Sequence, residues 1–158
     1  MTSWDEFAAA APSLASRVRA RFAAAESHVL ATLRSDGSPR VSGSEIDFRD
    51  GEAYLGSMLD ARKARDLRRD ARFALHACPG IEEGGDAKIA GRAVEVTDPA
   101  EVTRVQEGQE SHLFRLDVRE AVLTWVEENT LVVESWHPGR WERFDRPDNG
   151  PAVHTELG

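Results

Sequence analysis

Residues 28–44 read HVLATLRSDGSPRVSGS and carry the pattern that decides the fold. From His28 the side chains follow a period of two, in which Val29, Ala31 and Leu33 alternate with Leu30, Thr32 and Arg34, as in a β-strand. The pair Asp36-Gly37 ends this alternation, and such a pair supplies the positive φ angles that a tight hairpin turn requires. A second extended run begins at Arg40, so the segment predicts an antiparallel hairpin.

The residues after this hairpin continue the same pattern. A second strand is predicted at about Arg40–Phe48, and Asp50-Gly51 then turns the chain into a third strand that ends near Gly56. Runs of apolar and β-branched residues predict four further strands, at 73–78, 87–96, 113–126 and 131–136. This number favours a mainly β, α+β fold in which six to seven antiparallel strands close into a small barrel with peripheral helices.

Three helical segments are expected around the strands. Ser3 and Glu6 have the spacing of a capping box, and apolar residues then recur at helical spacing to residue 25. Pro12 lies inside this pattern and predicts a kink or two short helices. Asp60 is expected to cap a strongly basic helix of about ten residues, and Asp98-Pro99 is expected to start a third helix.

The length of 158 residues is that of one compact domain. We divide it into an N-terminal helical segment (1–25), a split-barrel cofactor-binding region (26–136) and a C-terminal tail (137–158). The tail is rich in Pro, Gly, Asp and Arg, so we expect it to be flexible or to pack against a partner. No signal peptide or membrane span is recognised, and a soluble, cytoplasmic protein is expected.

Composition excludes several function classes. The net charge of −8 disfavours general binding to nucleic acid or anionic membranes. Cys78 is the only cysteine, so neither an intrachain disulfide nor a thiolate metal cluster is possible. His28, His76 and His112 lack metal-ligand spacing and are expected to be hydrogen-bonded structural residues. No nucleophile-base set is readable, so we predict no catalytic side chain and no metal site.

A local basic site remains possible despite the acidic total. Arg62 and Lys63 fall in the first turn of the basic helix, where free N–H groups and the helix dipole favour an anion. On an extended strand Arg40, Ser42 and Ser44 face one side. The two features predict a wall and a clamp for a phosphorylated ligand. The alternative is that the basic helix presents only a solvated charged face.

Three stretches together resemble the pyridoxamine 5'-phosphate oxidase-like split barrels: VLATL at 29–33, DGSPRV at 36–41 and ARKARDL at 61–67. The resemblance extends over about residues 26–136. It implies a split β-barrel, a homodimer with two cofactor sites between the subunits, and FMN or the deazaflavin coenzyme F-420 as cofactor. It also implies an oxidoreductase in which the cofactor transfers hydride to or from a small organic substrate.

The resemblance assigns the cofactor site residue by residue. The cofactor-binding positions that it implies are Arg40, Val41, Ser42, Gly43, Ser44, Ser57, Met58, Arg62, Lys63 and Lys88. Arg62 and Lys63 would hold the phosphate, and Lys88 would reach the cofactor of the second subunit, although a structural salt bridge explains Lys88 equally well. Asp86 replaces the amide of the authentic oxidases, and residues 136–141 lack their substrate-phosphate groups, so pyridoxal phosphate synthesis is not expected.

Two other readings remain open at this point. The chain could be a non-catalytic flavin- or haem-binding protein, for which His76 or His112 would be the axial ligand. It could instead be an interaction module that uses the basic helix to bind an acidic partner or RNA.

Overall fold

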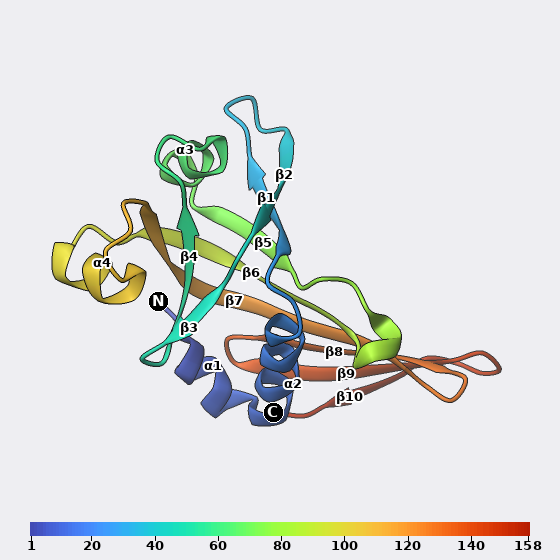
Figure 1. Ribbon diagram of the computed structural model, residues 1–158. Coiled ribbons are helices and arrows are strands. Elements are labelled where there is room, and N and C mark those ends of the chain that lie inside the picture. The colour runs from blue at the N-terminus through green and yellow to red at the C-terminus, as the bar shows by residue number, and fades with distance from the viewer.

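The computed structural model describes residues 1–158 as one ten-stranded antiparallel sheet with four α-helices (Figure 1). The helices are α1 (Trp4–Ala10), α2 (Pro12–Ala23), α3 (Arg62–Arg69) and α4 (Pro99–Gln106), with one short 3-10 helix, η1 (Ile81–Glu83). The strands are β1 (His28–Leu33), β2 (Pro39–Ser44), β3 (Asp47–Arg49), β4 (Glu52–Ser57), β5 (Arg72–His76), β6 (Asp86–Glu95), β7 (His112–Glu127), β8 (Thr130–His137), β9 (Arg140–Pro147) and β10 (Val153–Glu156). The predicted α+β split-barrel class is confirmed.

The two N-terminal helices form as the sequence predicts. The Ser3 hydroxyl accepts from the backbone N–H of Glu6, and the Glu6 carboxylate accepts from that of Ser3, which completes the capping box. Pro12 separates α1 from α2 and begins the second helix, where its missing N–H costs no hydrogen bond. Phe7, Leu14 and the other apolar residues of the stripe are fully buried against the sheet.

Strand β7 organises the sheet because it pairs with three other strands. Its first residues pair with β4, residues 114–124 pair with β6, and its second half pairs with β8. The order β2-β1-β5-β6-β7-β4-β3 therefore forms a barrel that is not fully closed, and β8, β9 and β10 extend the sheet away from it (Figure 1). A bulge in β7 at Arg119, opposite Ala90 and Gly91 of β6, bends this sheet.

Residues 40–48 correct the prediction of one continuous strand. The chain pairs with β1 only as far as Ser44, and it pairs with β4 only from Asp47 onward. Glu45 and Ile46 lie between the two strands in no regular structure. The chain breaks here because its two halves hydrogen-bond to different sides of the split barrel.

Asp60 does not cap α3. Its backbone is in the left-handed conformation, with φ 60°, and the helix begins at Arg62 after Ala61, without a side-chain cap. The Asp60 N–H instead points to His112 Nε2, at 3.4 Å. The residue is therefore part of the turn that leaves β4.

The C-terminal segment is also corrected, from a flexible tail to two strands. Pro138-Gly139 makes a two-residue hairpin loop between His137 and Arg140, with Gly139 at φ 82°. The indole N–H of Trp141 donates to Glu134 on β8 at 2.6 Å. These strands account for most of the difference between ten strands and the expected six to seven. None of the four helices has the length and apolar composition of a membrane span.

Candidate functional site

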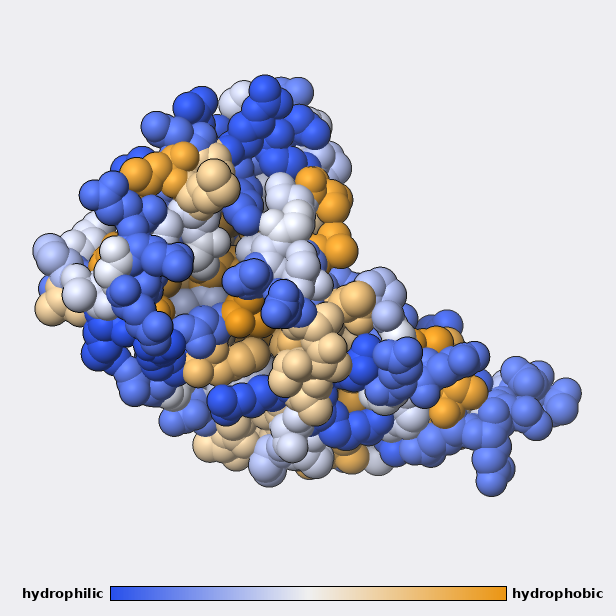
Figure 2. Space-filling model, in the orientation of Figure 1, coloured by the Kyte–Doolittle hydropathy of each residue, from blue (hydrophilic) through white to orange (hydrophobic).

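A pocket with a volume of about 930 Å³ lies at the open side of the barrel and is called the larger pocket below. Its walls come from the β2–β3 segment on one side and from α4 and the loop after it on the other, and β4 contributes its floor. Figure 2 shows the surface hollowed between the region over α4 and the region over β2 and β3. A volume of this size is within the range of small-molecule and cofactor sites.

Five of the residues predicted to bind a cofactor line this pocket: Gly43, Ser44, Ser57, Met58 and Lys63. The ammonium of Lys63 donates to the carbonyl oxygen of Gly43 at 2.9 Å, which ties the first turn of α3 to the end of β2. Burial lowers the pKa of Lys63, and the nearby Glu45 carboxylate opposes this effect. The pocket thus contains the ammonium of Lys63 in a fixed position, beside a strand with small side chains.

Arg40 and Arg62 are not in the same pocket as Lys63. Both line a smaller one of about 310 Å³, which shares no residue with the first. The guanidinium Nε of Arg40 is 2.7 Å from the Asp66 carboxylate of α3. The predicted three-residue phosphate clamp is therefore divided between two neighbouring pockets.

The remaining predicted residues line neither of these pockets. Ser42 is half-buried and faces the same side as Arg40 and Ser44, as its strand position predicts, while Val41 is 68 % exposed on the opposite face. Lys88 lies on β6 with its ammonium 4.0 Å from Glu120, the geometry of the structural salt bridge that the sequence left open. Contact of Lys88 with a second subunit's cofactor stays a prediction.

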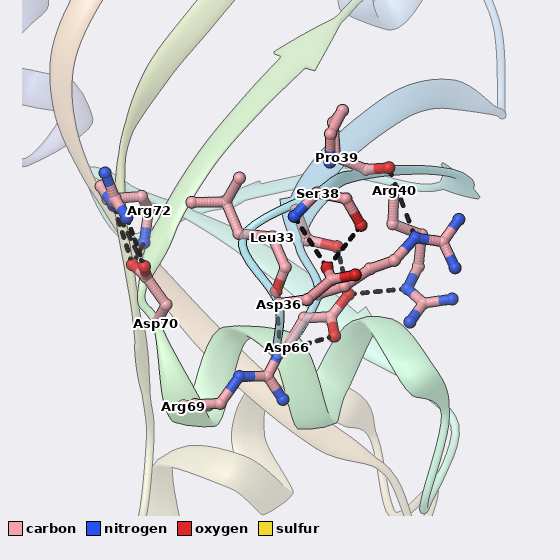
Figure 3. Close-up of polar contacts among 11 residues, drawn as sticks. Leu33, Asp36, Ser38, Pro39, Arg40, Asp66, Arg69, Asp70 and Arg72 are labelled. Carbon is pink, nitrogen blue, oxygen red and sulfur yellow. Dashed lines mark hydrogen bonds and ion pairs between the residues drawn. The ribbon is translucent and has the colours of Figure 1, made fainter.

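Asp66 holds the hairpin β1–β2 onto α3. Its carboxylate accepts from the Thr32 hydroxyl at 2.7 Å, from Arg40 at 2.7 Å and from Arg69 at 3.0 Å. Figure 3 shows Asp66 between Arg40 and Arg69, at the junction of the strands and the helix. Burial alone would raise the pKa of Asp66, but the hydrogen bonds from Arg40, Thr32 and Arg69 hold it below the usual value.

Sequence reasoning missed the α4 side of the larger pocket. The buried Tyr54 lines the pocket and donates its hydroxyl to Glu101 of α4 at 2.8 Å, and Arg115 also contacts this carboxylate. Burial raises the pKa of Tyr54, and the hydrogen bond from Arg115 lowers that of Glu101. The apolar residue Val105 of α4 packs on Tyr54 and Leu113. Its place on an apolar face of the predicted third helix was the sequence feature that could have indicated this wall.

The histidines are engaged in structural contacts. His28 is buried and accepts from the Cys78 N–H at 3.0 Å, and His112 pairs with Glu95 at 3.0 Å. His76 Nδ1 lies 2.5 Å from the Ala77 carbonyl oxygen. None of these three residues lines the larger pocket.

Solved structures share this fold at low sequence identity. PhzG from Burkholderia lata, in complex with tetrahydrophenazine-1-carboxylic acid, has 16% identity and a TM-score of 0.64, with 97% of this chain and 92% of that chain covered. A conserved hypothetical protein from Mycobacterium tuberculosis has 21% identity and a TM-score of 0.56, with 67% and 81% covered. A heme binding protein from Mycobacterium smegmatis has 15% identity and a TM-score of 0.54, with 93% and 88% covered.

Sequence comparison identifies the family. No curated protein sequence matches the chain. The family model described as "Pyridoxamine 5'-phosphate oxidase" matches residues 14–129, which include both pockets' β2 and α3 residues and most of the sheet. This chain belongs to the pyridoxamine 5'-phosphate oxidase-like family of split-barrel proteins.

Proposed function

We propose that the chain is an oxidoreductase that binds a flavin-type cofactor, FMN or coenzyme F-420, in the larger pocket. The observation that carries this proposal is that β2, the end of β4 and the first turn of α3 meet there, and bring Gly43, Ser44, Ser57, Met58 and Lys63 to one cavity of about 930 Å³. Family membership supports the same class of ligand. Such a cofactor would supply hydride transfer, which no side chain of the pocket provides.

The residues present fit a flat, phosphorylated ligand. Gly43 and Gly56 line the pocket and carry no side chain, so the backbone at these two positions can approach a ring closely. Lys63 supplies a cation next to the N-terminus of α3, where an anionic phosphate is favoured. Arg40 and Arg62, from the neighbouring pocket, are the further phosphate contacts that we propose. The roles of the chain are to bind, orient and shield the cofactor.

Haem is the less supported ligand for this pocket. It would need an axial side chain, and His76 and His112, the two candidates, lie outside the lining residues. Turnover of a substrate distinguishes an oxidoreductase from a non-catalytic flavin-binding protein. Reduced cofactor on the protein should be reoxidised without oxygen when a small organic acceptor is supplied, and a binding protein would leave it reduced.

We also propose that the chain acts as a homodimer. The outer face of β2, β1, β5 and β6 carries a row of small apolar residues, Val41, Ala31, Ala74 and Ala90, which the strand register places side by side. Figure 2 shows apolar residues along the outer edge of the β1–β2 hairpin. This row of small apolar side chains suits close packing against a second copy.

An absorbance spectrum and equilibrium titrations with FMN and with F-420 test the cofactor proposal. Lys63→Glu should weaken binding about tenfold or more, because a charge-assisted hydrogen bond contributes roughly 1.5–3 kcal/mol. Arg68→Glu is the matched control: it makes the same charge inversion on α3, outside both pockets, and should change affinity less than about twofold. Equal affinities of Lys63→Glu and the unaltered chain would remove Lys63 from the site, and failure of both cofactors to bind would overturn the proposal.

A further inference from the structure

A third pocket, with a volume of about 410 Å³, shares no residue with the two described above. We call it the α2 pocket, because α2, the η1 loop between β5 and β6, and the end of β7 form its walls. Its lining residues are Arg17, Ile81, Glu82, Gly84, Trp125 and Val126. Figure 1 shows η1 at the end of the sheet opposite α3. The α2 pocket therefore lies away from the phosphate-binding residues of α3, and its volume is that of a small-molecule site.

A buried arginine of α2 holds the η1 loop in place. Arg21 is 7 % exposed, and its guanidinium donates to the carbonyl oxygens of Glu83 at 2.9 Å and of Cys78 at 3.3 Å. The loop also lies close against β7, since a Cβ at Gly85 would come within 2.9 Å of the Thr124 carbonyl oxygen. This wall of the pocket is therefore fixed before a ligand binds, which lowers the entropic cost of binding.

Arg17 supplies a cation whose hydrogen-bond donors are free. Its guanidinium lies over the Trp125 ring, 3.9 Å from the ring centroid, and makes no hydrogen bond or ion pair within the chain. Contact with the ring face restricts the position of the guanidinium but uses none of its N–H groups. Arg143, the other cation near this ring, is engaged by Asp145 and Glu127. The cation that remains available to an anion is therefore Arg17.

The rest of the α2 pocket is apolar apart from one carboxylate. Ile81 and Val126 are 36 % and 53 % exposed, so both present apolar area to a ligand beside Trp125. Glu82 is exposed and forms no ion pair with Arg17, although both residues line the pocket. The pocket thus offers apolar contacts together with two opposite charges that are not paired with each other.

We propose that the α2 pocket binds a small carboxylate with an apolar body, independently of the cofactor. A carboxylate accepts two parallel N–H bonds from one guanidinium, and the free donors of Arg17 suit this geometry. The apolar body packs on Ile81 and Val126 and is removed from water there. A free acid and an α-amino acid present the same chemistry, and in an amino acid the ammonium group pairs with Glu82.

Titration of the full chain with 3-phenylpropionate at pH 7, followed by NMR of the indole N–H groups, tests this site. The chain has four tryptophans, and a spectrum of Trp125→Phe assigns the signal of Trp125. This signal should shift saturably, with a dissociation constant of about 1 mM or lower. The uncharged analogue 3-phenylpropanol should bind about tenfold more weakly or less, because it has no carboxylate for Arg17.

A pair of variants on α2 tests the role of the cation. Arg17→Gln should weaken binding of 3-phenylpropionate about tenfold or more. Arg19→Gln is the matched control, since Arg19 also lies over an aromatic ring, that of Phe48, but is outside the pocket. It should leave affinity within about twofold. Unchanged indole signals of the other tryptophans verify that both variants are folded.

Each outcome of these titrations bears on the proposal. Absence of a saturable shift with both 3-phenylpropionate and L-phenylalanine overturns it, and so does an equal loss of affinity in Arg17→Gln and Arg19→Gln. Tighter binding of L-phenylalanine that is lost in Glu82→Gln indicates an amino acid, and equal or tighter binding of 3-phenylpropionate indicates a free acid. FMN and F-420 affinity should be unchanged in Arg17→Gln, so failure here is distinguishable from failure of the cofactor proposal.

Discussion

Replacement of Asp66 by alanine tests the contact that joins the β1–β2 hairpin to α3. The Asp66 side chain is 3 % exposed, and Arg40, one of its ion-pair partners, is 16 % exposed. Removing one member of a buried pair costs about 3–5 kcal/mol, because the other charge is left dehydrated without a partner. Arg40 keeps some contact with water and Arg69 keeps more, so we expect a loss at the lower end, about 3 kcal/mol.

Urea unfolding followed by tryptophan fluorescence measures this loss, with all variants at one protein concentration and without cofactor. The double variant Asp66→Leu with Arg40→Met is the control, because removing both partners should cost less than removing Asp66 alone. An Asp66→Ala variant that loses less than about 1 kcal/mol would refute the reasoning. So would a double variant less stable than Asp66→Ala.

The same carboxylate predicts a pH dependence. Its pKa is lower in the folded chain than in the unfolded chain, so its stabilisation is present above the unfolded pKa of about 3.9 and is lost as the pH falls through the folded pKa. Asp66→Asn should remove this part of the acid sensitivity.

Two further predictions concern the frame of the sheet. Gly91→Ala should lower the free energy of unfolding by more than about 2 kcal/mol, or prevent folding, because a Cβ at Gly91 would overlap the carbonyl oxygen of Asp117. Thermal melts of this variant and of the control Gly37→Ala, which lies in an open turn, measure the effect. Equal melting temperatures of the two variants would contradict the prediction. His28→Asn should keep an acceptor for the Cys78 N–H but remove the part of the pH dependence of stability that comes from His28. Burial lowers the pKa of His28 from its ordinary 6.5, so protonation favours the unfolded chain as the pH falls below 6.5 and until it passes the folded pKa. Unfolding at pH 5 to 7 should therefore show a smaller pH slope for the variant, and an unchanged slope would be evidence against His28 as its source.

The elements that local patterns encode could be predicted from the sequence. Asp36-Gly37, Asp50-Gly51 and the capping box of Ser3 and Glu6 act over a few residues, and each forms where it was expected. The C-terminal strands could not be predicted in the same way, because their polar composition is typical of a tail. Their order comes from pairing with β8 and from the Trp141–Glu134 contact, which composition does not reveal.

Only the β2 and α3 side of the candidate site could be predicted from the sequence. Residues of β2 and of α3 were found because they are close in sequence and carry the family resemblance. Tyr54 and the α4 wall were missed, because their contact with Glu101 depends on where α4 packs and not on a local motif. The separation of Arg40 from Lys63 was missed as well, since the Arg40–Asp66 ion pair is visible only once α3 lies against the hairpin.

The pairing of β4 with β7 imposes an order on folding during synthesis. Tyr54 pairs with Arg115, so β4 leaves the ribosome about 60 residues before its partner strand exists. Until then the β4 edge of the β3–β4 hairpin, which forms the floor of the larger pocket, is unpaired. The N-terminal half can make its local hairpin early, but the ligand-binding cavity is completed only by a late, long-range step. Nascent or truncated chains that end before residue 112 should therefore have neither a stable barrel nor a functional pocket.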